Sequence, residues 1–136
     1  MGSQAIRRWF EDYLAAFNRA DFPGFGRYYA ENVVFHGQAA QVVGRQAVLD
    51  FYRQVRAYLD ERVDLLTFVA APDGGAIMAE LRTSLVATRD WPDMPTGPMR
   101  AGDRRDSVNI AFYDIADGQF QRIRTARLSP QREARP

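Results

Sequence analysis

The one histidine of the chain, His36, is the side chain whose type points most directly to chemistry. Histidine is the only side chain whose unperturbed pKa places its charge change near neutral pH, so it is a common general acid or base. His36 follows the apolar residues 33–35 and precedes Gly37, where a glycine allows a ligand to approach the backbone closely. If the protein performs proton chemistry near pH 7, His36 is therefore the first candidate. The alternative is a strand-end histidine that bonds to backbone or faces solvent.

The residue types that are missing exclude many other kinds of site. The chain has no cysteine, which excludes disulfides, thiolate nucleophiles and cysteine-ligated zinc or iron–sulfur sites. All 18 basic residues are arginine, so no lysine is present for a Schiff base or a P-loop. One histidine cannot form a two-histidine metal site within one chain. We therefore expect no cofactor and no metal. Binding, or acid–base chemistry by His36, carboxylates and tyrosines, remains.

Composition predicts one compact domain that is large enough to contain a lined cavity. The 136 residues are 46% hydrophobic and 12% aromatic, enough for a core with a lined cavity. The formal net charge of +1 gives no reason to expect a nucleic-acid or membrane partner. No run is long enough to span a bilayer, and residues 1–10 lack the apolar segment of a signal peptide, so we expect a cytoplasmic protein. The predicted domain covers residues 1–130, and residues 131–136 form a flexible tail.

The elements that must position these side chains are helices first and strands afterwards. Apolar residues spaced three and four apart predict helices over residues 4–19 and 45–60, and Asp21 is the expected N-cap of a short helix between them. Short strands are expected around Phe35 and Val42. Two hairpins follow, with strands over residues 63–70, 76–88, 105–115 and 119–128. This order predicts an α+β fold with helices on one face of an antiparallel sheet.

Period-two alternation gives each late strand an inner and an outer face. On the strand 76–88, the predicted inner face consists of Ala79, Leu81, Thr83 and Leu85. On the last strand, the matching face holds Ile123, Thr125 and Arg127. An arginine there could bind a carboxylate or phenolate. The opposite register would instead turn Arg122 and Arg124 inward.

Residues 89–103 contain three prolines and two glycines and are predicted to form a long loop. Long loops in small domains are commonly lids or binding loops. Trp91, Met94 and Met99 make this loop apolar and adaptable, so we expect it to close over an apolar ligand. Packing against the sheet edge or a dimer partner is the alternative.

Several motifs together resemble a known family. They are YYAENVVFHG at residues 28–37, the pattern G-R-x-A-V-x-x-F-Y at residues 44–52, and hairpins that end in a D-G turn. The loop DMPTG, residues 93–97, is similar to the Pro-Thr-Gly loop often found before the fifth strand of SnoaL-like proteins. Over about residues 6–129, the chain resembles the nuclear transport factor 2-like superfamily. Within it, the resemblance is to the SnoaL-like polyketide cyclases and their ketosteroid isomerase relatives.

This resemblance implies a fold and places some residues. The implied fold is the nuclear transport factor 2-like (cystatin-like) cone, a curved, largely antiparallel mixed sheet wrapped around three N-terminal helices, with one apolar pocket. Such domains usually form homodimers through the sheet. Tyr13 matches the isomerase tyrosine that donates to an oxyanion, and the isomerase's general base falls on Gly37, next to His36. The second acidic position falls near Ala111, one register from Asn109, so both family carboxylates are missing here.

The resemblance and the residues together suggest a cofactor-independent enzyme for a small, apolar, oxygenated metabolite. The reaction would be a cyclisation, isomerisation, dehydration or epoxide opening, in which His36 moves the proton while Tyr13 and Asn109 stabilise negative charge on oxygen. The alternative is a non-catalytic module of the same fold that binds a small molecule or mediates dimerisation. The predicted substrate-binding residues are Trp9, Tyr29, Phe51, Tyr52, Leu81, Trp91, Met94, Thr125 and Arg127.

Overall fold

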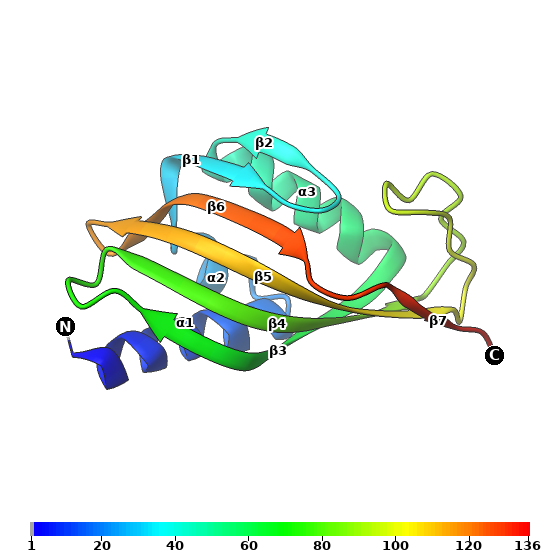
Figure 1. Ribbon diagram of the computed structural model, residues 1–136. Helices are drawn as coiled ribbons and strands as arrows, with labels where there is room; N and C mark the ends of the chain where they lie inside the picture. Colours follow the sequence, from blue (N-terminus) through cyan, green and yellow to red (C-terminus); the bar gives the residue numbers. More distant parts are fainter. Residues whose placement is uncertain (1) are drawn as a thin grey trace.

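Three helices pack against a curved, seven-stranded sheet in the computed structural model (Figure 1). The model describes residues 2–136, apart from the side chain of Ser3. The helices are α1 (Ser3–Asn18), α2 (Phe22–Gly26) and α3 (Arg45–Tyr58). The strands are β1 (Tyr29–His36), β2 (Gln41–Val43), β3 (Leu59–Ala70), β4 (Ala76–Ala87), β5 (Arg104–Ala116), β6 (Gln119–Arg127) and β7 (Arg132–Ala134). The predicted α+β fold, with helices on a curved mixed sheet, is confirmed.

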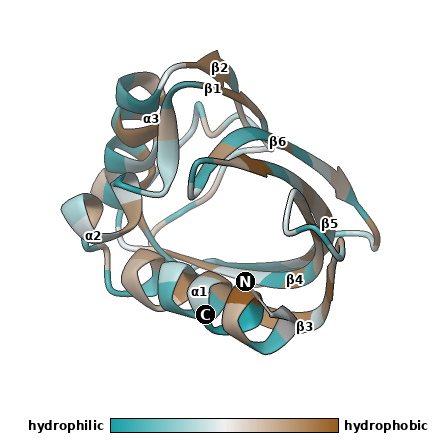
Figure 2. Ribbon diagram, turned by 90° about the vertical axis from the view of Figure 1, so that its left-hand side faces the viewer, coloured by the Kyte–Doolittle hydropathy of each residue, from teal (hydrophilic) through white to brown (hydrophobic). Residues whose placement is uncertain are grey.

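The sheet order brings distant parts of the chain together. Its strands follow the order β2-β1-β6-β5-β4-β3, and β7 pairs with β5 outside this path. Only the β1–β6 pair is parallel among the described strands. In Figure 2 the sheet curves so that its inner face is turned toward the helices. The inner faces of β3 to β6 and the inward sides of α1 and α3 therefore share one interior.

Each helix forms for a reason that the sequence carries. On α1, Ile6, Phe10, Tyr13 and Phe17 recur at helical spacing and are all buried. Asp21 caps α2 as predicted, because its Oδ1 accepts a hydrogen bond of 3.0 Å from the backbone N–H of Gly24. These contacts place the aromatic side of α1 against the sheet.

The junction between α3 and β3 differs from the prediction. The helix ends at Tyr58, two residues earlier than expected, and Leu59 is already extended, with φ −152° and ψ 161°. Leu59 is completely buried, and the strand that it begins pairs with β4 from the Leu59–Ala87 position onward. Tertiary burial of this side chain outweighs the weak local preference for another helical turn. Glu61 consequently belongs to a strand rather than to a connection.

The C-terminal segment also differs from the prediction. Instead of the expected flexible tail, residues Arg132–Ala134 form β7, which pairs with Arg104–Asp106 of β5. The backbone of β5 is available there because β6 pairs only with the part of β5 that begins at Asn109. An unpaired strand edge is a ready template for another extended segment. The domain boundary at residue 130 stays a prediction.

The long loop packs on the chain's own core. Trp91, Met94 and Met99 are buried in a cluster with Val55 and Leu59, among other residues. The indole of Trp91 stacks on the Tyr58 ring, with centroids 4.5 Å apart and an angle of 13° between the planes. This agrees with an apolar loop beside the pocket. Dimerisation through the outer face of the sheet, where Met78 and Val86 are exposed, stays a prediction.

One side chain connects the end of α1 to β3. The Asn18 amide donates to the carbonyl oxygen of Val63 at 2.9 Å, and its Oδ1 accepts from the Val63 N–H at 2.8 Å. Both backbone groups of Val63 are thus satisfied by one amide. Among residues 2–136, no helix has the length and apolar character needed to cross a membrane.

Replacing Asn18 with alanine should lower the free energy of unfolding by about 1 to 3 kcal/mol, because two part-buried backbone groups lose their partner. Urea unfolding of N18A and wild type measures this difference. R19A, which alters the neighbouring exposed side chain, is the matched control. A loss for N18A no larger than for R19A would contradict the prediction.

Candidate functional site

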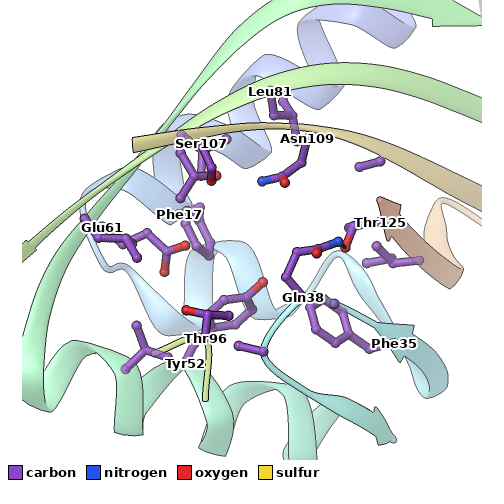
Figure 3. A pocket seen from close by; sticks show the side chains of 18 of the residues that line it. Phe17, Phe35, Gln38, Tyr52, Glu61, Leu81, Thr96, Ser107, Asn109 and Thr125 are labelled. Carbon is purple, nitrogen blue, oxygen red and sulfur yellow. Dashed lines mark hydrogen bonds between the residues drawn. The ribbon is translucent and has the colours of Figure 1, made fainter. Parts of the chain in front are cut away.

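A pocket of about 150 Å³ lies between the inner face of the sheet and helices α1 and α3. Strands β3 to β6 contribute alternate residues to its wall, as the period-two pattern requires. The predicted inner face of β4 is confirmed for Leu81, Thr83 and Leu85, which line the pocket. In Figure 3 the side chains of Glu61, Asn109 and Tyr52 point toward the middle of this space.

Glu61 is the acidic residue of the pocket wall in the described chain. Its Oε1 atom is buried and has no hydrogen-bond partner within residues 2–136. Burial raises the pKa of Glu61 from 4.5 to about 7, and the positive charge of Arg56 opposes part of this rise. Arg56 is held elsewhere, because its Nη2 donates to the carbonyl oxygen of Phe17 at 2.7 Å. Glu61 can therefore gain or lose a proton near neutral pH.

Asn109 is the second polar group without a partner. Its Oδ1 is buried and accepts no hydrogen bond within the described residues. The register pairs Asn109 with Leu81 of β4 and with Arg127 of β6. Between Glu61 and Asn109 on the inner face lies the cross-strand pair Thr83–Ser107, and both of its residues also line the pocket. These polar residues thus lie diagonally across β3, β4 and β5.

Three tyrosines place their hydroxyl groups in or next to the pocket. The hydroxyls of Tyr13 and Tyr29 are 2.7 Å apart and buried. Burial raises the pKa of Tyr13, and it raises the pKa of Tyr29 and of Tyr52 well above 10.0. All three hydroxyls consequently keep their protons at physiological pH. The Tyr52 hydroxyl points into the pocket and makes no side-chain hydrogen bond within residues 2–136, so it is free to donate to a ligand.

The pocket brings together most of the predicted site residues. The predicted residues that line it are Tyr13, Phe51, Tyr52, Leu81, Met94, Asn109, Thr125 and Arg127. The register of β6 is the predicted one, because Arg124 lies on the outer face, where its guanidinium is 4.7 Å from the centre of the Phe112 ring and 3.8 Å from Asp114. Whether these residues contact a substrate stays a prediction.

His36 does not lie where it was expected. Its side chain is exposed and is not among the residues that line the pocket. Alternation explains the difference, because Phe35 turns inward and its successor must turn outward. Only the backbone of His36 approaches the wall, where its carbonyl oxygen accepts from the Thr125 hydroxyl at 3.3 Å. The neighbouring residues Gly37 and Gln38 do line the pocket.

Three predicted binding residues also lie outside the wall. Trp9 packs against the rings of Tyr28 and Phe120, at 5.1 and 5.2 Å between centroids. The Tyr29 hydroxyl is hydrogen-bonded to that of Tyr13, and Trp91 is buried against Tyr58. Their aromatic surface fills the core around the pocket instead of lining it. No group of three or more His, Cys, Asp or Glu side chains in residues 2–136 is placed to hold a metal ion.

Sequence reasoning missed Glu61. The predicted helix ended at residue 60 and the predicted strand began at residue 63, so this glutamate fell in a connection. The available signal is the alternation of Leu59, Glu61, Val63 and Leu65, which places a lone carboxylate on an apolar strand face. A buried acid in a cleft is a typical sign of a functional site.

The raised pKa of Glu61 predicts a specific pH dependence of stability. The unfolded chain releases this proton near pH 4.5, whereas the folded protein holds it up to about pH 7. The free energy of unfolding should therefore fall by about 1 to 3 kcal/mol as the pH rises through this window, and this decrease should be absent in E61Q. Urea unfolding between pH 4.5 and 8 measures it. H36Q should keep the decrease, and an E61Q profile parallel to wild type would contradict the assignment.

Several solved structures are similar to this chain. The chain is similar to a candidate polyketide cyclase from Xanthomonas campestris pv. campestris, with 25% identity and a TM-score of 0.77 over 90% of this chain and 89% of that one. It is also similar to an LEH-like epoxide hydrolase from M. tuberculosis, with 16% identity and a TM-score of 0.69 over 88% and 80% of the two chains. A candidate ketosteroid isomerase from Kribbella flavida DSM 17836 has 16% identity and a TM-score of 0.65, over 93% and 80%.

These three likenesses support the fold and leave the activity open. A search of the curated proteins found no match. The model of the SnoaL-like domain matches residues 6–123, which include nearly all of the helices and strands that form the pocket. The chain therefore belongs to the SnoaL-like family.

Proposed function

We propose that this protein is a cofactor-independent acid–base enzyme in which Glu61, rather than His36, transfers the proton. The observation that carries the proposal is the half-buried carboxylate of Glu61 in the pocket, whose Oε1 is buried and unpartnered within residues 2–136 and whose pKa is raised to about 7. A base whose pKa lies near the working pH is deprotonated in a large fraction of the molecules. It is also basic enough to accept a proton from the substrate. Burial supplies this tuning without a second carboxylate.

The other polar groups fit the demands of the same reaction. When Glu61 removes a proton from a carbon next to a carbonyl, negative charge develops on the carbonyl oxygen. The Tyr52 hydroxyl and the Asn109 amide, which both face the pocket, are donors for that oxygen. The protonated Glu61 then returns the proton to a different atom, so the substrate is rearranged and no proton is consumed. This sequence serves an isomerisation or a cyclisation, and its proton abstraction is also the first step of an elimination, in which Glu61 would pass the proton to the leaving group.

The pocket also limits the substrate. A volume of about 150 Å³ suits a molecule of one or two rings, since an apolar cavity of roughly that size holds benzene. Leu81, Leu85 and Phe17 provide apolar wall between the polar groups. A small cyclic ketone or enone combines these properties. Because one structural neighbour is named as an epoxide hydrolase, activation of water by Glu61 for epoxide opening is the second candidate.

Proton abstraction can be tested without the natural substrate. The protein should accelerate deuterium incorporation next to the carbonyl of 2-tetralone in D₂O, measured by NMR, and E61Q should lose about 100-fold or more of this rate. The rate should rise with pH around 7, because the deprotonated carboxylate is the base. H36Q is the matched control and should keep the wild-type rate. Hydrolysis of styrene oxide tests the second candidate in the same variants.

The outcomes separate the proposals. If neither probe reacts while 2-tetralone binds in the pocket, the protein is a binding module and the enzyme proposal is wrong. If the rate is lost in H36Q and retained in E61Q, the base has been assigned to the wrong residue.

The donor roles lead to a separate expectation. Y52F should lower the exchange rate about 10-fold or more by removing one hydrogen bond to the developing oxyanion, without shifting the pH profile set by Glu61. F51L, which changes a neighbouring lining residue without removing a polar group, is the control. Equal effects in Y52F and F51L would assign Tyr52 a packing role only.

A further inference from the structure

The C-terminal segment reaches the pocket from outside the sequence range that the family model matches. Gln131 is one of the lining residues, although it follows the end of β6 and precedes β7. In Figure 1, β7 lies at the same end of the molecule as the loop between β4 and β5. Met94 and Thr96 of that loop also line the pocket. Two separate segments therefore complete one part of the wall.

A buried arginine joins these two segments. The side chain of Arg105 on β5 is only 6% exposed, and its Nε lies 2.6 Å from Oε1 of Glu133 on β7. Its Nη1 donates to the Thr96 hydroxyl at 3.2 Å and to the carbonyl oxygen of Gly97 at 3.1 Å, and its Nη2 donates to that of Pro98 at 3.3 Å. Every nitrogen of the guanidinium is thus used to connect the loop to the tail.

A second, longer link runs in parallel. The buried Asp103, at the end of the loop, accepts from the backbone N–H of Arg100 at 3.0 Å. Its Oδ2 lies 3.8 Å from Nε of Arg135 in the tail. The two tail partners reach residues two positions apart, because Glu133 approaches Arg105 and Arg135 approaches Asp103. The tail is consequently held to the loop by charge.

Apolar packing contributes little to this attachment. All three residues of β7 are exposed, and the Glu133 side chain is 47% exposed. Segments with few buried apolar contacts open at much lower cost than the rest of a fold. Within the described residues, Glu133 is the only acidic partner of Arg105. When the tail leaves, the buried Arg105 guanidinium loses its counter-charge, and its desolvation is no longer compensated. Movement of the guanidinium toward water would then weaken its hydrogen bonds to the loop.

We propose that residues 131–135 are a strap that controls access to the pocket, and that the Arg105–Glu133 pair couples its release to that of the loop residues 94–98. With the pair intact, Gln131, Met94 and Thr96 close one side of the ligand site. With the pair broken, the strap and this part of the loop move away together and the ligand can exchange. Arg105 is a positioning residue in this scheme, and it acts in the same way whether the pocket catalyses a reaction or only binds.

The loop contains a tryptophan, Trp91, whose fluorescence can be used to follow opening of the loop. Trp91 is buried, and the chain has one other tryptophan, Trp9, which the core rings hold away from the pocket wall. In a W9F background, acrylamide quenching of Trp91 fluorescence reports opening of the loop. Hydrogen exchange of the Gly97 and Met99 amides, which bond to Met94 and Trp91, reports the same event independently.

The test compares E133Q and a chain that ends at Pro130 with the intact protein. Both variants should raise the quenching constant of Trp91 and the exchange rate of the two loop amides by about threefold or more. High salt should raise both by a larger factor in the intact protein than in E133Q, because E133Q keeps only the longer Asp103–Arg135 pair to be screened. R132Q changes an exposed neighbour on β7 and should behave like the intact protein. Urea unfolding verifies that each variant is folded.

Wild-type quenching and exchange in both E133Q and the shortened chain would overturn the strap. An increase in the shortened chain alone, or an equal increase in R132Q, would overturn the role of the Arg105–Glu133 pair.

Discussion

The desolvation of one carboxylate is the constraint on which the site depends. Moving a charged carboxylate out of water is costly unless a partner compensates, and Glu61 has none for Oε1 within the described residues. The fold offers Arg56 nearby but binds that guanidinium to the Phe17 carbonyl oxygen. The remaining way to limit the cost is to keep the proton. A pKa of about 7 is thus a consequence of packing, and it is also the property that an acid–base catalyst requires.

The surrounding architecture makes this arrangement tolerable. The hydroxyls of Tyr13 and Tyr29 are hydrogen-bonded to each other, so each has a partner other than the Glu61 carboxylate. The second core cluster, which includes Val55, Leu59 and Trp91, anchors the junction between α3 and β3 from which Glu61 projects. Glu61 therefore sits near a rigid start of a strand, where its position is determined by Leu59 on one side and Val63 on the other. Rigid placement of this kind reduces the reorganisation needed during a reaction.

Much of the fold and part of the site could be predicted from the sequence. Alternation along β4 and β6 identified the inward residues, including Thr125 and Arg127, because a period of two is a strong local signal. The same rule, applied one strand earlier, would have turned His36 outward once Phe35 was taken as buried. Glu61 was missed although the same alternation runs from Leu59 to Leu65, because tertiary burial of Leu59 ends the helix early and helical periodicity does not report where the helix ends. The tail was missed for a related reason, since β7 depends on a free stretch of β5 far away in sequence.

The departure from the family pattern has a physical logic of its own. Gly37 and Ala111, which match positions where the resemblance to the isomerases implies carboxylates, both line this pocket without contributing charge. Two carboxylates that share a small cavity raise each other's pKa, so their roles depend on their mutual distance. A single carboxylate entering from β3 needs no such partner, because burial raises its pKa and Arg56 opposes only part of the rise. The pocket thus combines several hydroxyl groups with one titratable carboxylate, which enters from β3.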